Sequence, residues 1–356
     1  MSNRHGLPLL AQREDELSKC AYCPKLSRAT CIVSEAEPRE ALTPWGKMTS
    51  AFEATKSGAD PERAELAWGC SNCFHCREAC DHRNEVAPTL NDARADYVAL
   101  ELAPPRVAAL LERTEAIEAE HVAAAERLEQ TPGVRSDARQ ALLLGCRYAK
   151  VFPDEARAAI RLAVALSGPV RLLRGCCGAW QRAAGAAEAA NAAQRRLAAE
   201  LGEKGRLLVL DPRCALELSE LRPLTLVELA ARHPERFEPP SSRPEPVRYH
   251  DSCALGRGLG IYEPPRRLLA RVTGSAPLEL VTSRERARCS GAGGILPVSM
   301  PDISRAAAAR LTDEHQALGG GALVTSCASS LSRLRGAGVA AVDLIALLES
   351  RLGAHG

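Results

Sequence analysis

The sequence has few aromatic residues, few lysines and no long apolar run. Aromatics make up 3% of its 356 residues, so the core must be built from Ala, Leu and Val. No run of about 18 apolar residues occurs, which predicts that no helix crosses a membrane. The N-terminus lacks the apolar core of a signal peptide. Only six of the 46 basic residues are lysine and the formal net charge is +2, which argues against general nucleic-acid binding.

Nucleotide-binding glycine motifs are also missing. No G-x-G-x-x-G opens a strand–helix unit, so the sequence shows neither a flavin nor a nicotinamide fingerprint. Any hydride chemistry would then lie on a partner protein.

What the sequence does have is fourteen cysteines, and nearly all fall in clusters. A C-x2-C-x2-C run is a poor disulfide framework and a good metal-binding one, and the chain is not a small loop-rich domain. We therefore expect thiolates held by iron in a reducing cytoplasm, with peripheral attachment to the inner face of the membrane left open.

The first seven cysteines follow a ferredoxin-like pattern. Residues 70–80 read C-x2-C-x2-C-x3-C, and residues 20–31 hold a partial copy. In two-cluster ferredoxins the fourth cysteine of each motif serves the other cluster. We therefore predict one complete four-iron cluster on Cys70, Cys73, Cys76 and Cys31. A second, incomplete site is predicted on Cys20, Cys23 and Cys80.

Ser27 stands where the second site needs its third cysteine. A serine hydroxyl ionises far less readily than a thiol and is a weaker partner for iron. Three outcomes stay open for this site: a three-iron cluster, a labile four-iron cluster, or nothing. Asp81, His75 and His82 are candidate substitute ligands. A zinc knuckle is the alternative for residues 70–80, but three cysteines at successive two-residue gaps favour iron.

The remaining cysteines form a repeated trio. Cys176 and Cys289 are 113 residues apart, and so are Cys214 and Cys327. An offset kept at two landmarks indicates a duplicated domain.

Hydrophobic patterning divides the chain into four parts. Short helices are expected within residues 1–103, and residues 104–135 predict a connector helix that packs on its own domains or docks a partner subunit. Strands and helices are expected to alternate in residues 136–238 and again in residues 246–356. One of these helices is expected at 179–201. A Pro/Ser linker at 237–246 separates them. This alternation predicts mostly parallel sheets covered by helices. Cysteines that follow strands would then converge on one edge of each sheet.

The segments LLLGC, GCCGAW, DPRC, YHDSCALGRGLGIYEPPRRLL, RCSGAGG and VTSC resemble the paired cysteine-rich (CCG) domains of the heterodisulfide reductase family. With the ferredoxin-like motif before them, the chain resembles the iron–sulfur subunits of glycolate oxidase, anaerobic glycerol-3-phosphate dehydrogenase and lactate utilisation. The resemblance implies a multidomain fold, with an N-terminal α-helical ferredoxin domain followed by two tandem α/β CCG domains with mostly parallel sheets.

The resemblance also implies two further metal sites. Their ligands would be Cys146, Cys176, Cys177 and Cys214 in the first CCG domain, and Cys253, Cys289 and Cys327 in the second. A full set of five cysteines binds a non-cubane cluster in this family, and reduced sets bind zinc or nothing. Here Glu217, Ser290 and Ser330 replace cysteines. The first domain is expected to hold iron–sulfur or zinc, and the second is degenerate, with zinc aided by His250 or no metal.

Two smaller features leave alternatives open. Gly291, Gly293 and Gly294 suit either a phosphate cradle or a close backbone approach to a metal site, and the second is the better interpretation. His250 and Asp251 suit either a shell that orients a ligand or a buried histidine with its own hydrogen-bond partner.

Three functions fit these motifs. The favoured one is an electron-transfer subunit that passes electrons from a flavin-dependent dehydrogenase to a quinone, a thiol or another carrier. The others are direct disulfide chemistry at the first CCG site and a non-enzymatic metal-binding or redox-sensing protein. No catalytic residue is assigned.

Overall fold

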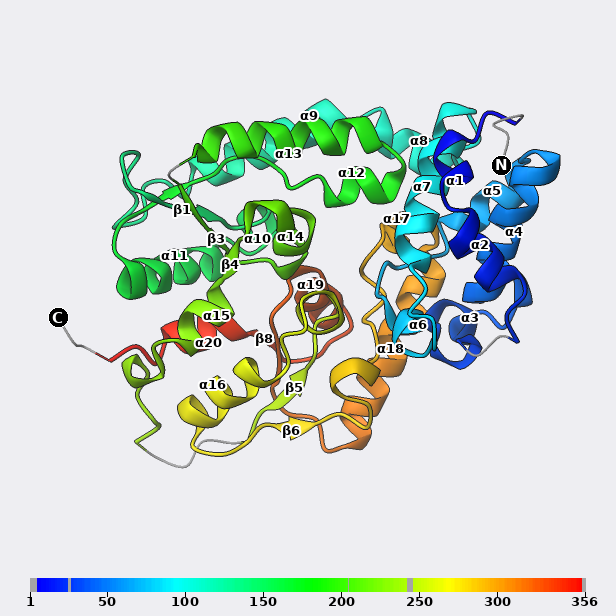
Figure 1. Ribbon diagram of the computed structural model, residues 1–356. Helices are drawn as coiled ribbons and strands as arrows, with labels where there is room; N and C mark the ends of the chain where they lie inside the picture. The colour runs from blue at the N-terminus through cyan, green and yellow to red at the C-terminus, as the bar shows by residue number, and fades with distance from the viewer. Residues whose placement is uncertain (1–4, 25–26, 204, 242–245, 354–356) are drawn as a thin grey trace. The chain divides into compact units, whose positions relative to one another are not determined.

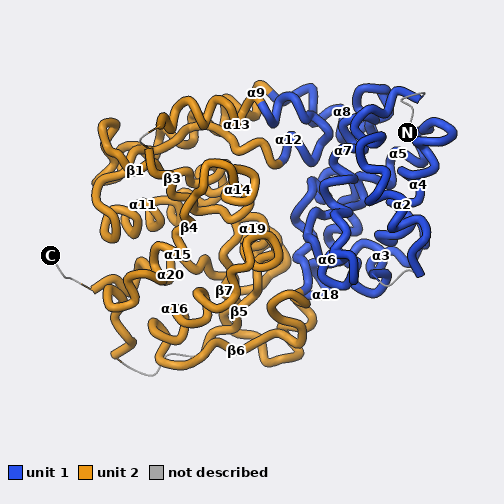
Figure 2. The backbone as a smooth tube through the Cα atoms, viewed as in Figure 1, with its two compact units in different colours: residues 1–114, 180–191, 288–311 blue, residues 115–179, 192–287, 312–356 orange. Residues whose placement is uncertain are grey.

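The computed structural model describes residues 5–24, 27–203, 205–241 and 246–353 (Figure 1). Part of the predicted linker, residues 242–245, lies outside them. The chain divides into two compact units, each assembled from separate stretches of sequence (Figure 2). The first unit contains residues 1–114, 180–191 and 288–311. The second unit contains residues 115–179, 192–287 and 312–356.

Helices build the first unit. Its N-terminal stretch contains α1 (Pro8–Ala11), α2 (Glu14–Ala21), α3 (Ile32–Ala36), α4 (Pro44–Ser57), α5 (Pro61–Ala67), α6 (His75–Glu78), α7 (Val86–Ala99) and α8 (Pro105–Leu111). Two of them start with a capping side chain followed by proline. The Thr43 hydroxyl accepts a hydrogen bond from the Gly46 amide at 3.0 Å, and Asp60 accepts one from the Arg63 amide at 3.0 Å. Capping side chains and proline at the first position both favour helix initiation, so local sequence fixes where α4 and α5 begin.

The later stretches of sequence complete this unit. They supply most of α12 (Ala179–Ala184), α17 (Leu296–Ser299) and the start of α18 (Pro301–Ala317). Trp68 is fully buried, and its Nε1 donates to the carbonyl oxygen of Ala184 at 3.3 Å. Arg288 and Arg310 both pair with Glu35 of α3, at 2.6 and 2.9 Å. The first unit therefore depends on residues more than 200 positions away from its N-terminal helices.

Two small parallel sheets organise the second unit. One joins β1 (Gln140–Leu143), β2 (Val170–Leu172), β3 (Arg206–Val209) and β4 (Leu224–Thr225) in the order β2-β1-β3-β4. The other joins β5 (Arg248–His250), β6 (Leu278–Glu279), β7 (Leu323–Thr325) and β8 (Ala341–Asp343) in the order β6-β5-β7-β8. All pairings are parallel, and each strand has its counterpart at the same place in the other sheet. The predicted α/β alternation and the predicted duplication are confirmed by this shared topology.

Helices connect these strands, as a parallel sheet requires. They are α9 (Thr114–Glu126), α10 (Cys146–Val151), α11 (Pro153–Ser167), α13 (Ala187–Leu201), α14 (Pro212–Glu217), α15 (Leu226–Ala231), α16 (Glu263–Thr273), α19 (Ala328–Gly336) and α20 (Leu344–Glu349). A short π-helix at Ala254–Gly258 follows Cys253. Among the described residues, no helix is long and apolar enough to cross a membrane.

Two helices expected to be continuous are broken. The stretch 179–201 splits into α12 and α13 at Gly185, whose φ is +99°. A Cβ on Gly185 would lie 2.6 Å from the carbonyl oxygen of Arg94, so the break lets two backbone segments approach. The connector likewise splits into two helices: α8 ends at Leu111 and α9 begins at Thr114.

Candidate metal centres

The first candidate centre gathers the four thiols predicted for the complete cluster. Cys70, Cys73 and Cys31 all interact electrostatically with Cys76, and Cys31, Cys70 and Cys76 do so with the ammonium group of Lys47. The loop after α5 makes this possible because Asn72 and Phe74 adopt left-handed φ values of 53° and 61°. Such values are unfavourable for residues other than glycine, so the surrounding contacts hold the loop in this shape.

Lys47 is the unexpected member of this centre. Its side chain is buried, with Nζ 3.5 Å from Cys31 Sγ and 2.8 Å from the carbonyl oxygen of Gly69. Burial lowers the pKa of Lys47, but the charges on the neighbouring thiolates outweigh it, so the pKa is raised overall. A buried ammonium ion needs negative charge beside it. Four thiolates around a cluster would supply that charge, so the residues present fit an iron–sulfur cluster.

Burial lowers the pKa of a lysine but raises the pKa of a cysteine. It raises the pKa of Cys76 well above its ordinary value, helped by repulsion from Cys70, and Lys47 only partly offsets this. Burial also raises the pKa of Cys70. A bound metal cation would counteract this effect and favour the thiolate forms that bind iron.

Arg94 of α7 fixes the backbone behind Cys70. Its guanidinium donates to the carbonyl oxygens of Cys70 at 2.7 Å, Ala67 at 2.8 Å and Ala183 at 2.8 Å. The side chain is fully buried, and desolvation lowers its pKa to about 10. The guanidinium of Arg94 therefore joins the backbone at the start of the cysteine loop to the backbone of α12.

The glycine-rich segment after Cys289 packs on the same loop. A Cβ on Gly294 would lie 2.3 Å from the carbonyl oxygen of Cys70, and one on Gly293 would lie 2.4 Å from that of Ser71. These distances favour the close backbone approach over a phosphate cradle. Cys289 Sγ lies 3.8 Å from Ser71 Oγ and belongs to a core cluster that packs against Cys31 and Cys73.

The second candidate centre is a cavity of about 390 Å³. It is lined by the predicted Cys20, Cys23 and Cys80, by Cys76 and Ser27, and by the proposed substitutes Asp81 and His82. Asn84 Nδ2 lies 3.0 Å from Cys20 Sγ. Burial raises the pKa of Cys20 to about 11, although this hydrogen bond lowers it. His75, the third proposed substitute, is not among the residues that line this cavity.

The third candidate centre lies in the second unit, beyond the carboxyl ends of β1, β2 and β3. Neighbouring thiols there lie within hydrogen-bonding distance, in a chain of Cys146, Cys176, Cys177 and Cys214. Parallel strands carry these residues to one edge of the sheet because each cysteine follows a strand. The Gly178 amide also approaches Cys176 Sγ at 3.5 Å.

Sequence reasoning missed His121 at this centre. A ring nitrogen of His121 and the sulfurs of Cys146 and Cys176 all lie within 4.8 Å of one another. The residue sits on α9, in a segment that the sequence presents only as an amphipathic connector. No motif spacing links it to Cys146, so a structure was needed to find it.

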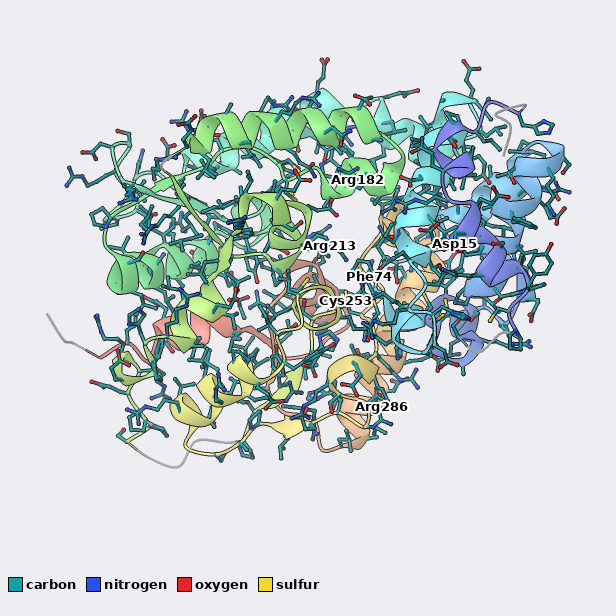
Figure 3. All side chains as sticks on the ribbon, viewed as in Figure 1. Asp15, Phe74, Arg182, Arg213, Cys253 and Arg286 are labelled. Carbon is teal, nitrogen blue, oxygen red and sulfur yellow. The ribbon has the colours of Figure 1, made fainter. Side chains whose placement is uncertain are left out.

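Cysteines of the second repeat are divided between the units. Cys253 and Cys327 belong to the second unit, whereas Cys289 belongs to the first. Arg213 interacts electrostatically with Cys253, Cys327 and Glu217, and Figure 3 shows Arg213 and Cys253 close together. Burial raises the pKa of Cys327 to about 12. Glu217, the residue at the fifth cysteine position, thus faces a guanidinium group.

Both polar residues before Cys253 have partners of their own. His250 is buried, with Nδ1 3.3 Å from Thr325 Oγ1. Both oxygens of Asp251 accept hydrogen bonds from Arg266, at 2.8 and 2.7 Å. These contacts favour a structural role for the pair over a role in orienting a ligand.

Comparison with known proteins agrees with the repeated topology. Residues 141–219 and 247–335 each match the model of the CCG cysteine-rich domain. These segments lie within the two stretches, 136–238 and 246–356, in which the sequence predicts α/β domains.

Several relatives share parts of the chain. It is 43% identical over 58 residues to one of the subunits of the dihydromethanophenazine:CoB--CoM heterodisulfide reductase of Methanosarcina acetivorans, covering 16% of this chain and 14% of that protein. It is 46% identical over 50 residues to the probable iron-sulfur-binding oxidoreductase FadF of Bacillus subtilis, a match that covers 14% of this chain and 7% of that protein. A longer match, 24% identical over 298 residues, is to one of the subunits of the fumarate reductase (CoM/CoB) of Methanothermobacter marburgensis and covers 77% and 59%. The chain thus spans only part of the length of these relatives. It carries two CCG cysteine-rich domains and is similar, over parts of its length, to subunits of heterodisulfide reductase and fumarate reductase.

Proposed function

We propose that this chain is an iron–sulfur electron-transfer subunit. It would receive electrons from a flavin-dependent dehydrogenase of the 2-hydroxyacid type, or within a heterodisulfide reductase-like complex, and pass them to a quinone, a thiol or another carrier. The observation that carries the proposal is the convergence of Cys31, Cys70, Cys73 and Cys76 beside the buried Lys47. Names of relatives that include heterodisulfide reductase, fumarate reductase and an iron–sulfur oxidoreductase support the same chemistry.

The residues of this centre have distinct parts in the proposal. The four thiolates would hold a [4Fe-4S] cluster, which supplies one-electron chemistry when bound. Lys47 holds positive charge against them, and Arg94 fixes the backbone of the cysteine loop. Two buried cations next to an anionic group favour its more reduced, more negative form.

A second candidate function rests on the incomplete centre. Its cavity brings Cys20, Cys23, Cys80 and Ser27 together, and it is large enough to admit solvent or small molecules. A site with one weak ligand loses iron readily, which suits a redox or iron sensor. Electron transfer remains the primary proposal because the first centre has a full set of thiols.

The decisive experiment measures iron, zinc and acid-labile sulfide on anaerobically purified protein, with EPR spectra before and after dithionite. The variant Cys73→Ala should remove about four irons per chain and one reduced signal. Cys80→Ala, in the same stretch of sequence, should leave that signal in place. Photoreduced deazaflavin then serves as electron donor and duroquinone as acceptor, and only Cys73→Ala should abolish transfer. Zinc without sulfide in the reconstituted wild type would refute the proposal.

A further inference from the structure

A groove of about 410 Å³ lies within the first unit. Its lining comes from α5, from the start of α8 and from the segment that joins α17 to α18. Pockets that bind small molecules in proteins have volumes of about 300 to 1,000 Å³ and are mostly apolar. The apolar part of this lining consists of three prolines, a methionine and an isoleucine: Pro104, Pro105, Pro301, Met300 and Ile303. Such a surface suits a flat, uncharged ring.

The floor of this groove also belongs to the core around the first candidate centre. Met300 and Ile303 are 8% and 7% exposed, and they are members of the apolar cluster that packs against Cys31 and Cys73. The terminal methyl group of Met300 would lie 3.4 Å from a Cβ on Gly69, which directly precedes the cysteine loop. A molecule held in the groove would therefore exchange electrons with a cluster at that centre across packed side chains and not across solvent.

Most of the charge at the rim of the groove is already paired. Glu37 lies 3.2 Å from Arg39. Asp302 pairs with an arginine of its own helix, Arg305. The two other charges in the lining are one glutamate and one arginine, so they cancel. Because an ion of either sign would meet no net attraction, the rim favours a neutral ligand.

These two other charges are Glu65 and Arg106. Neither side chain has an ion-pair or hydrogen-bond partner among the residues described. Arg106 can donate to a carbonyl oxygen, and Glu65 can accept from a hydroxyl group. A quinone ring carries carbonyl oxygens, and the quinol formed by its reduction carries hydroxyl groups at the same positions. The unpaired donor and acceptor thus match the two states of such a ring.

We propose that this groove binds the ring of a quinone and is the place where electrons leave the chain. The inference rests on the proposed electron-transfer function, and it adds the class of the acceptor and its site. Two electrons, delivered singly from an iron–sulfur cluster at the first centre, and two protons from solvent convert the quinone to its quinol. No bond to the protein forms or breaks. Arg106 stabilises negative charge on a ring oxygen, and Glu65 passes on one of the protons.

Reduction of duroquinone by the full chain with its clusters tests the groove. Arg106→Gln should raise the KM for duroquinone about 10-fold, because a hydrogen bond to a charged group is lost. Pro105→Trp places a large ring in the groove and should abolish saturation by duroquinone. Arg63→Gln changes an arginine of α5 outside the groove lining, so it is the matched control and should keep the wild-type KM. Isothermal titration calorimetry with menadione should give the same order of affinities without turnover.

The ferrocenium ion serves as a second acceptor, because it needs no binding site. Both groove variants should reduce it at the wild-type rate and keep the reduced EPR signal of the first centre. A wild-type KM for duroquinone and a wild-type affinity for menadione in both groove variants would overturn the inference. If Cys73→Ala still abolished transfer, that result would leave the electron-transfer proposal intact. Transfer that survives in Cys73→Ala would instead refute the electron-transfer proposal and this inference with it.

Discussion

Lys47 Nζ lies 3.5 Å from Cys31 Sγ, inside the first unit and away from solvent. Cys31 is the ligand that comes from the partial motif, so the contact couples a buried positive charge directly to the predicted four-iron centre. Lysine is rare in this chain, with six in 356 residues, and the other two lysines described in the first unit are more exposed. The position of Lys47 therefore suggests that its charge controls the reduction potential of the first centre.

Replacing Lys47 with methionine should lower the midpoint potential of the first centre. Loss of one positive charge within a few ångströms of the cluster removes a stabilisation of the reduced form, by on the order of 100 mV at an effective dielectric constant near 20. EPR-monitored redox titration measures the shift. Lys56→Met, on the exposed end of the same helix α4, serves as the control and should shift the potential little. A rise in potential for Lys47→Met would contradict this account.

Replacing Arg94 with leucine should destabilise the first unit by at least about 3 kcal/mol, because buried carbonyl oxygens would lose their donor. All three tryptophans, Trp45, Trp68 and Trp180, belong to this unit, so their fluorescence reports its unfolding in urea. Arg305→Leu changes an exposed arginine and should stay within about 0.5 kcal/mol of wild type. Equal midpoints for the two variants would show that the Arg94 contacts carry little stability.

Replacing Ser27 with cysteine should fill the second centre. The new thiol would line the same cavity as Cys20, Cys23 and Cys80 and complete a set of four. If the wild type holds a three-iron cluster, iron should rise by about one atom per chain and sulfide should stay the same. If the wild type holds no cluster there, iron and sulfide should each rise by about four. Ser57→Cys, at an exposed position of α4, should leave both unchanged. No gain in iron in Ser27→Cys, together with no iron at this site in the wild type, would mean that the cavity does not hold a cluster.

The free energy of unfolding of the second unit should fall as the pH rises, because the buried carboxyl group of Asp343 ionises. Burial raises its pKa to about 6, although hydrogen bonds from Tyr148 and the amides of α20 lower it. The folded state then binds more protons than the unfolded state between about pH 4 and 6, so the free energy of unfolding falls by about 3 kcal/mol across that window.

Urea unfolding followed by circular dichroism from pH 4 to 7 tests this dependence. Asp343→Asn keeps a capping oxygen but cannot ionise, so its curve should be flatter than that of the wild type. Asp154→Asn, at a side chain that is 90% exposed, should behave like the wild type. Parallel curves for wild type and Asp343→Asn would rule out this carboxyl as the source.

The spacing of the cysteines in the sequence was enough to predict the members of the first centre. The crossed set of Cys31 with Cys70, Cys73 and Cys76 was a prediction from motif spacing, and the structure brings these residues together. The parallel sheets followed from alternating apolar runs, since such strands need helical connections. The break at Gly185 was missed because it depends on a distant neighbour: the chain bends where it meets Arg94, which lies 91 residues earlier.

Residues that act through long-range contacts were beyond the reach of motif reading. His121 and Lys47 sit on helices whose sequence shows only ordinary amphipathic or mixed character. Their burial next to thiols arises from packing among elements distant in sequence. Cys289 shows the same limit, because its repeat position predicts a place with Cys253 and Cys327, whereas its described neighbours include Ser71.

The discontinuity of the first unit has a consequence for how the protein is made. Its N-terminal helices leave the ribosome first, but Gly294, Arg288 and Ala184 are needed to close its core around the cysteine loop. Domains usually fold in the order of their synthesis. Here the first seven cysteines must wait until residue 311 has emerged before their surroundings are complete. Iron delivered during translation would meet an open, solvent-exposed set of thiols, and cluster insertion should therefore be largely a late, post-translational event.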